Sequence, residues 1–275
     1  MKRILYLVIA LGLALPLSAQ KTLTLVHLND THSHIDPQRS GVKIGQGGVI
    51  EQSAFIDSVR HADGRRNVLL LHAGDFGQGT SYFTELNGDI EIDILNAMQP
   101  DAVSLGNHEF DNGVVELARR LSNLKAPMLC ANYSFEGTVL ENLIEPYTIV
   151  RKAGYKIGII GLLTDVTRVV DASIAGHMKY LNPITVANEY AKYLKETKGC
   201  DLVIALTHIG YNHTSGEHND IALAAGSRDI DVIVGGHSHT FLKEPTIVTN
   251  LDGEEVPVVQ DGCWGLEMGL MKIRK

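Results

Sequence analysis

The sequence predicts an α/β fold with a largely parallel sheet, and two observations support this. Short apolar runs rich in β-branched residues recur along the chain, and each ends abruptly in a polar cluster. Segments with apolar residues at helical spacing lie between these runs. Continuous apolar runs of this length indicate strands buried on both faces, and their alternation with helices is typical of α/β proteins.

The elements follow in order along the chain. We expect strands over residues 23–28, 68–71, 102–105, 157–163, 202–206 and 232–234. Helical spacing predicts helices over residues 48–61, 88–98, 114–124 and 186–197. The pattern then changes, because residues 246–248 and 256–259 flank a polar turn and are typical of a hairpin, with a further strand over residues 266–273. We expect these last strands to be antiparallel members of a mixed or second sheet.

Composition limits the classes of function. The 275 residues include 24 Lys+Arg and 32 Asp+Glu, so the formal net charge is −8 and a nucleic-acid polymer is disfavoured as a partner. The three cysteines, Cys130, Cys200 and Cys263, form no C-x-x-C pair, which favours buried thiols over a disulfide framework or a thiolate zinc site. No linker, repeat or low-complexity tract follows residue 20, so we expect one domain. The 12 histidines of this acidic chain are the feature that composition leaves unexplained.

The first residues have the pattern of an export signal. Lys2 and Arg3 precede an uncharged apolar run over residues 4–17, and Ser18-Ala19-Gln20 follows it. This order predicts a signal peptide over residues 1–19, cleavage after Ala19 or Gln20, and a secreted or periplasmic product. The run is short for a bilayer span, so an uncleaved anchor is the less favoured alternative and we expect no stable membrane anchor.

Residues with metal-ligand chemistry follow the predicted strands. They are Asp30, His32, Asp75, Asn107, His208, His237 and His239. In sheets of this kind the loops after the strands converge, so we expect these side chains to meet. Oxygen and nitrogen ligands without a thiolate suit Zn, Mn, Fe or Co. Seven groups exceed the four that one tetrahedral zinc needs, which predicts two divalent metal ions with Asp75 as the natural bridge.

Such a centre would suit phosphate chemistry. Two divalent ions outweigh the charge of two carboxylates, so the site would attract an anionic phosphate ester although the chain is acidic. Metals roughly 3.5–4 Å apart can lower the pKa of a shared water and orient a phosphoryl group for in-line attack. His108 lies next to Asn107 and can protonate a leaving group without binding metal, while Asp111 orients its ring. These two residues are the predicted catalytic pair.

The neighbouring residues are expected to have supporting roles. For Glu109 we favour a hydrogen-bonding support over a catalytic base. The glycines of residues 74–79 are not a Walker loop, because no Gly-Lys-Ser/Thr follows, and we expect them to permit tight turns. His34 is a candidate support beside the first ligand pair. The remaining histidines are expected in structural or solvated positions, namely His27, His72, His61, His177, His213 and His218.

Five motifs in this order resemble those of the calcineurin-like metallophosphoesterases. They are Asp30-Thr31-His32, Gly74-Asp75-Phe76-Gly77-Gln78-Gly79, Gly106-Asn107-His108-Glu109-Phe110-Asp111, Thr207-His208 and Gly236-His237-Ser238-His239. The Asn-His-Glu-Phe-Asp form is similar to the 5′-nucleotidase and UDP-sugar hydrolase branch. The resemblance implies a four-layer αββα sandwich of two mixed sheets.

The resemblance also implies roles for individual residues. One metal would be held by Asp30, His32, Asp75 and His239, and the other by Asp75, Asn107, His208 and His237. His108 would assist the leaving group with Asp111 as its partner, and Asn132 would support the ligands from another strand end. The implied activity is hydrolysis of phosphomonoesters, with 5′-nucleotides as the leading substrates in that branch. Phosphodiesters, cyclic nucleotides, UDP-sugars and sulfur esters are the alternative substrates.

One departure from that branch concerns substrate binding. Its members usually carry a second domain that stacks the nucleobase between aromatic side chains. Residues 20–275 are expected to form the catalytic domain alone, without a C-terminal nucleotide-binding domain. A separately encoded substrate-binding domain is therefore an alternative source of specificity.

Overall fold

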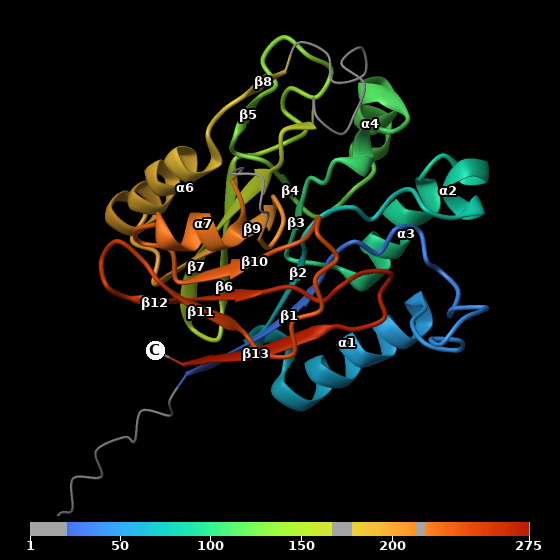
Figure 1. Cartoon of the computed structure of the whole chain (residues 1–275), viewed down its shortest axis with the longest axis horizontal. Helices are drawn as coiled ribbons and strands as arrows, with labels where there is room; N and C mark the ends of the chain where they lie inside the picture. Colours follow the sequence, from blue (N-terminus) through green and yellow to red (C-terminus); the bar gives the residue numbers. More distant parts are fainter. Residues whose placement is uncertain (1–20, 167–177, 213–217, 275) are drawn as a thin grey trace, which may run out of the picture.

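The computed structural model describes residues 21–166, 178–212 and 218–274 (Figure 1). The predicted signal peptide and two of the predicted surface histidines, His177 and His213, lie outside these ranges. Among the described residues, none of the helices combines the length and hydropathy that crossing a bilayer requires.

In the described part of the chain, the first sheet has five strands, and β1 lies second in it, beside the edge strand β13. Its order is β13–β1–β2–β3–β4, in which β1 to β4 are parallel and β13 is antiparallel to β1. The strands are β1 (Thr22–Leu28), β2 (Val68–His72), β3 (Ala102–Ser104), β4 (Met128–Leu129) and β13 (Gly269–Arg274).

The second sheet has a parallel centre between two antiparallel edges. Its order is β11–β12–β10–β9–β7–β6, with β6 and β11 antiparallel to their neighbours. The strands are β6 (Tyr147–Lys152), β7 (Tyr155–Leu163), β9 (Leu202–His208), β10 (Val232–Val234), β11 (Thr246–Thr249) and β12 (Glu255–Val259), and a separate pair comprises β5 (Tyr133–Ser134) and β8 (Lys179–Tyr180).

Helices cover the outer face of each sheet (Figure 1). Those on the side of the first sheet are α1 (Val49–Asp63), α2 (Ser81–Leu86), α3 (Asp89–Met98) and α4 (Gly113–Leu121). Those on the second are α6 (Pro183–Lys192), which continues as a π-helical turn (Tyr193–Thr197), and α7 (Asp220–Ala225).

Alternation along the strands separates the buried layers. In β1, Leu23 and Leu25 face the second sheet, whereas Val26 and Leu28 pack with α1 and α3. The layer between the sheets also contains Leu69 and Leu71 of β2 and Ile157, Ile159, Leu202, Ile204 and Leu206 of the second sheet. The molecule therefore has four layers, helices–sheet–sheet–helices, which confirms the predicted αββα sandwich of two mixed sheets.

The predicted strands and helices all occur, with bounds shifted by a few residues, and β11 and β12 form the predicted hairpin. The expected antiparallel pairing holds for β11 and β13, but it is wrong for β12 against the sheet, because β12 extends the parallel centre beside β10. The sequence interpretation missed β6, which is a half-exposed edge strand and lacks a fully buried run. It also missed short elements, namely α2, α7, β5 and β8, which are too short to give a periodic pattern, and β4 was implied only by the resemblance at Asn132.

Candidate active site

The seven predicted ligand residues lie together at one end of the two sheets. Asp30 and His32 follow β1, Asp75 follows β2, and Asn107 follows β3, all from the first sheet. From the second sheet, His208 is the last residue of β9, and His237 and His239 follow β10. The site is therefore built along the line where the two sheets meet.

The first group of possible ligands is Asp30, His32 and His239. His32 Nε2 lies 3.0 Å from His239 Nε2, and His239 Nε2 lies 3.3 Å from Asp30 Oδ1. Asp30 is fully buried, whereas His239 is partly exposed. Two imidazole nitrogens and a carboxylate oxygen thus converge on one point that solvent can reach.

The second group is Asp75, His208 and His237. His208 Nε2 lies 3.0 Å from Asp75 Oδ2, and the rings of His208 and His237 are 5.2 Å apart between centroids. Asn107 joins this group because its Oδ1 lies 2.8 Å from His237 Nδ1.

The two groups adjoin at Asp75. Its Oδ2 lies 3.0 Å from His208 Nε2 in its own group and 3.8 Å from His32 Nε2 in the other. One carboxylate therefore faces both groups, as the bridging position requires.

The orientation of the histidines fits a metal. His208 Nδ1 donates to the carbonyl oxygen of Ala73 at 2.6 Å, and His32 Nδ1 lies 3.3 Å from that of Gly77. These contacts direct each Nε2 into the site, which is how metal-binding histidines are oriented. His208 Nε2 is buried and lies 3.0 Å from Asp75 Oδ2. A divalent cation would take the place of the proton that these two atoms share when His208 is protonated.

The charges within the site are tightly coupled. Burial disfavours the protonated form of His208, but the carboxylates of Asp75 and Asp30 outweigh it and raise its pKa to about 10. Burial would raise the pKa of Asp75, yet His208 and His32 hold it well below its usual range. A hydrogen bond with Asp30 raises the pKa of His239 to about 10. The carboxylates thus attract positive charge strongly, which is the property a cation site needs.

The backbone at the ligands is strained. Five of the seven residues have positive φ, namely Asp30 (49°), His32 (46°), Asp75 (53°), His237 (76°) and His239 (52°). Residues other than glycine seldom adopt this conformation, and it persists only when surrounding contacts enforce it. Here the amide of Asp30 donates to the carbonyl oxygen of Gly74 at 3.0 Å, and the amide of His32 donates to that of Asp75 at 3.1 Å.

Glycine permits the close approach of these turns, as expected. Gly74 has φ of 86°, and a Cβ there would lie 2.8 Å from both the Gly106 amide nitrogen and His208 Nδ1. No larger residue fits between the ends of β2, β3 and β9 without moving a ligand.

Glu109 supports the turns rather than facing the ligand atoms. It is fully buried, and its carboxylate accepts hydrogen bonds from three amides, those of Asp75 (2.9 Å), Gly77 (3.1 Å) and Gly106 (2.8 Å). Burial and the nearby Asp75 carboxylate raise its pKa to about 7. This arrangement agrees with the support role that the sequence favoured.

His108 and Asp111 form the expected pair at the rim. His108 Nδ1 lies 2.9 Å from Asp111 Oδ2, and the His108 ring lies edge-on to that of His32 with centroids 5.3 Å apart. The hydrogen bond to Asp111 raises the pKa of His108. The His108 amide also donates to Asp75 Oδ1 at 2.9 Å, so the backbone of this half-buried pair is anchored to a candidate ligand.

The remaining predicted residues have clear places. Asn132 is buried and pairs with both backbone groups of Leu163 (2.7 and 2.8 Å), so it holds the end of β7. His34 stacks on Trp264, with ring centroids 4.9 Å apart. Other histidines lie outside the ligand groups, with His27 paired to Asp261, His72 near Thr31, His218 near Asn182 and His61 exposed. The three cysteines are buried free thiols, as expected.

The sequence interpretation missed Gln260. Its buried side-chain amide donates to the carbonyl oxygen of Gly236 at 2.9 Å and accepts from the Ser238 hydroxyl and the Thr240 amide, so it brackets the loop that carries His237 and His239. Gln260 directly follows β12, so the same rule of polar residues after strands would have found it.

The fold and the site define a class of protein, an αββα sandwich with two adjoining groups of possible metal ligands at the strand ends. The model of the calcineurin-like phosphoesterase family matches residues 23–241. The chain therefore belongs to the calcineurin-like phosphoesterase family.

Several relatives share one name. The chain is 34% identical over 291 residues to 5′-nucleotidase of Homo sapiens, covering 97% of this chain and 49% of that protein. It is 34% identical to a snake venom 5′-nucleotidase of Naja atra, covering 91% and 50%. The chain thus spans about half the length of these relatives.

Two solved structures of nucleotidases are similar to this chain in fold and sequence. The 5′-nucleotidase precursor of Thermus thermophilus matches with a TM-score of 0.82 and 37% identity, over 92% of this chain and 51% of that one. The NAD nucleotidase of Haemophilus influenzae matches with a TM-score of 0.82 and 31% identity, over 92% and 53%.

Proposed function

We propose that this chain is an exported phosphoesterase that uses two divalent metal ions to hydrolyse phosphomonoesters, with 5′-nucleotides as the leading substrates. The observation that carries the proposal is the pair of ligand groups that adjoin at Asp75. The names of the relatives support the nucleotide assignment.

The proposed ligand sets share one carboxylate. Asp30, His32, Asp75 and His239 would hold one ion, and Asp75, Asn107, His208 and His237 would hold the other. Such a pair of ions, of Zn, Mn, Fe or Co, supplies Lewis acidity that activates water and neutralises phosphoryl charge. The chain contributes rigid orientation, because Ala73 and Gly77 fix two of the imidazole rings.

In this proposal His108 carries the proton that the leaving group needs. Its Nδ1 is engaged by Asp111, which leaves Nε2 for the substrate oxygen. The raised pKa keeps more of the ring protonated near neutral pH, which is the form a general acid requires.

Export and domain organisation belong to the same proposal. Residues 1–19 would be removed as a signal peptide, and residues 20–275 would form the catalytic domain. The mass of the protein recovered from the periplasm or medium tests this, because cleavage after Ala19 or Gln20 gives two distinguishable masses.

A substrate panel tests the activity. With Mn²⁺, Co²⁺ or Zn²⁺ added, phosphate release is measured from AMP, UMP and an aryl phosphate. Nucleotide products are measured by chromatography from UDP-glucose, a cyclic nucleotide and NAD, which the name of one solved structure suggests. We expect turnover of AMP or UMP, and no turnover of any ester would overturn the proposal. Turnover of the aryl phosphate alone would favour a separately encoded substrate-binding partner.

A further inference from the structure

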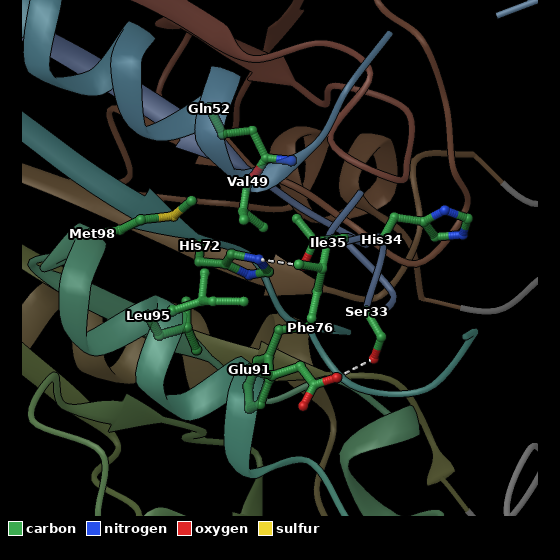
Figure 2. Close-up of a pocket in the computed structure, with 12 residues that line it drawn as sticks. Ser33, His34, Ile35, Val49, Gln52, His72, Phe76, Glu91, Leu95 and Met98 are labelled. Atoms are coloured by element: carbon green, nitrogen blue, oxygen red, sulfur yellow. Dashed lines mark hydrogen bonds between the residues drawn. The ribbon is translucent and has the colours of Figure 1, made fainter. Parts of the chain in front are cut away.

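A small cavity lies beside the turn that follows β1, and Ser33, His34 and Ile35 of this turn line it (Figure 2). Its volume is about 30 Å³, and its walls come from the turn, the end of β2, α1 and α3. A water molecule needs on the order of 10–15 Å³ of such space, so the cavity can hold about two.

Three residues that line this cavity each have one buried polar atom with no hydrogen-bond partner within the described part of the chain. These atoms are Gln52 Nε2, His72 Nδ1 and Glu91 Oε2. Their residues are 3%, 1% and 4% exposed. Buried polar atoms in folded proteins are almost always paired, with protein or with ordered water. Ordered water in the cavity is therefore a partner that these three side chains can share.

Two of the same side chains hold the turn with their other polar atom. Glu91 Oε1 accepts a hydrogen bond from the Ser33 hydroxyl (Figure 2). His72 Nε2 lies 3.1 Å from Thr31 Oγ1. Ser33 and Thr31 flank His32, and both His32 and Ser33 have positive φ (46° and 54°). Glu91 and His72 thus connect the cavity to a strained segment.

We propose that the cavity holds ordered water that links Gln52, His72 and Glu91, and that Glu91 and His72 are positioning residues that hold Thr31 and Ser33 so that His32 can reach its metal. The positioning part rests on the proposed function, because it assumes a metal at His32. The water network itself stands on the cavity and the unpaired atoms.

The chemistry of the wall favours water over a metal. In the described ranges, groups of three or more His, Cys, Asp or Glu close enough to share a metal occur only at the two ligand groups of the site. The unpaired atoms of the lining residues are a carboxylate oxygen, an imidazole nitrogen and an amide NH₂. Water can donate to the first and accept from the last, and it suits the imidazole in either tautomer.

A high-resolution crystal structure of the metal-loaded chain tests the water network. We expect at least one ordered water within about 3.2 Å of two of the three atoms. A dry cavity, or side chains turned to pair directly with one another, would overturn it. This test does not depend on catalytic activity.

Metal binding tests the positioning role. We expect the dissociation constant of Mn²⁺, measured by calorimetry, to rise at least fivefold in Glu91→Leu and to stay within twofold in Glu91→Gln, which can still accept from Ser33. Leu95→Ala is the matched control, because Leu95 lines the same cavity without a polar contact to the turn. It should lower thermal stability yet leave Mn²⁺ affinity within twofold.

Equal Mn²⁺ affinity in Glu91→Leu and wild type would overturn the positioning role. A loss of Mn²⁺ affinity in Leu95→Ala as large as that in Glu91→Leu would overturn it too. If Glu91→Leu does not fold, His72→Phe removes the contact to Thr31 and carries the same expectation. Failure of the wild type to bind Mn²⁺, Co²⁺ or Zn²⁺ would overturn the proposed function and the positioning role together, whereas the crystal structure would still decide the water network.

Discussion

The His108–Asp111 pair gives a prediction about the pH profile. The Asp111 carboxylate stabilises protonated His108, so the pKa of His108 lies above its usual value. Asp111→Asn removes that charge and lowers the pKa of His108. As pH rises, His108 therefore loses its proton at a lower pH in the variant than in wild type. We expect the alkaline limb of kcat/KM to move to lower pH, with a larger loss of activity at pH 8 than at pH 6.

The companion variant separates catalysis from metal binding. His108→Ala should retain its metal content and lose roughly 10²–10⁴-fold in turnover, the usual range for a general acid. Metal loss in His108→Ala would contradict the assigned roles. An alkaline limb of kcat/KM that stays at the same pH in Asp111→Asn would also contradict them.

Asp220 gives a prediction about stability at the residue scale. It is fully buried, its Oδ1 pairs with Thr207, and burial raises its pKa from 3.8 to about 8. Between these pH values the folded state holds a proton that the unfolded state has released, so the free energy of unfolding decreases as pH rises. Asp220→Asn, which cannot ionise, should reduce this decrease.

Urea titrations at pH 5 and pH 8 measure the effect. The difference between the two pH values should be smaller in Asp220→Asn than in wild type. Asp57→Asn, at an exposed position on α1, is the control and should leave the difference unchanged. An equal difference in wild type and Asp220→Asn would show that Asp220 is ionised in the fold.

At the scale of elements, the turns after the strands determine the site. Gly74→Ala would place a Cβ 2.8 Å from the backbone nitrogen of Gly106 at a positive φ, where alanine is already strained. We expect a loss of about 2–4 kcal/mol in the free energy of unfolding, in the range of severe local strain and overpacking, together with weaker metal binding.

The control for this variant is Gly199→Ala. Gly199 also has a positive φ, of 64°, but nothing lies within 4 Å of an added Cβ. It should lose about 1 kcal/mol and keep its metal affinity. An equal loss in the free energy of unfolding in Gly74→Ala and Gly199→Ala would show that the close approach of the strand ends does not add to the cost of a Cβ at Gly74.

Most of the strands and the ligand residues could be predicted from the sequence, whereas the backbone conformation of the turns could not. Buried strands such as β7 and β9 were predicted because both faces are covered and the apolar run is continuous. The ligand residues were predicted because parallel strands deliver their following residues to one edge. The left-handed backbone at Asp30 and His237 was not predicted, since it is enforced by contacts between residues distant in the chain, such as the His237 amide and Asp30 Oδ2 at 2.9 Å.

At the scale of the whole molecule, metal should stabilise the fold. A ligand that binds only the folded state adds about 2.7 kcal/mol at 100 times its dissociation constant. We therefore expect Mn²⁺ to raise the melting temperature by several degrees and a chelator to reverse the rise, measured by calorimetry.

Asp75→Asn should abolish most of this metal-dependent rise, because the proposed bridging carboxylate is lost. His61→Ala, which removes an exposed imidazole, should retain it. A similar rise in Asp75→Asn and wild type would place the stabilising ion elsewhere.

The division of the ligands between the two sheets has a consequence for how the protein matures. Asp30 and His32 come from the first sheet and His239 from the second, while Asp75 comes from the first and His208 and His237 from the second. Neither sheet alone contains a complete group, so a folding intermediate with only one sheet formed has no full set to capture an ion. If the two groups bind metal as proposed, we expect tight metal uptake to follow the docking of the two sheets, and the rate of metal capture would then report the completion of folding.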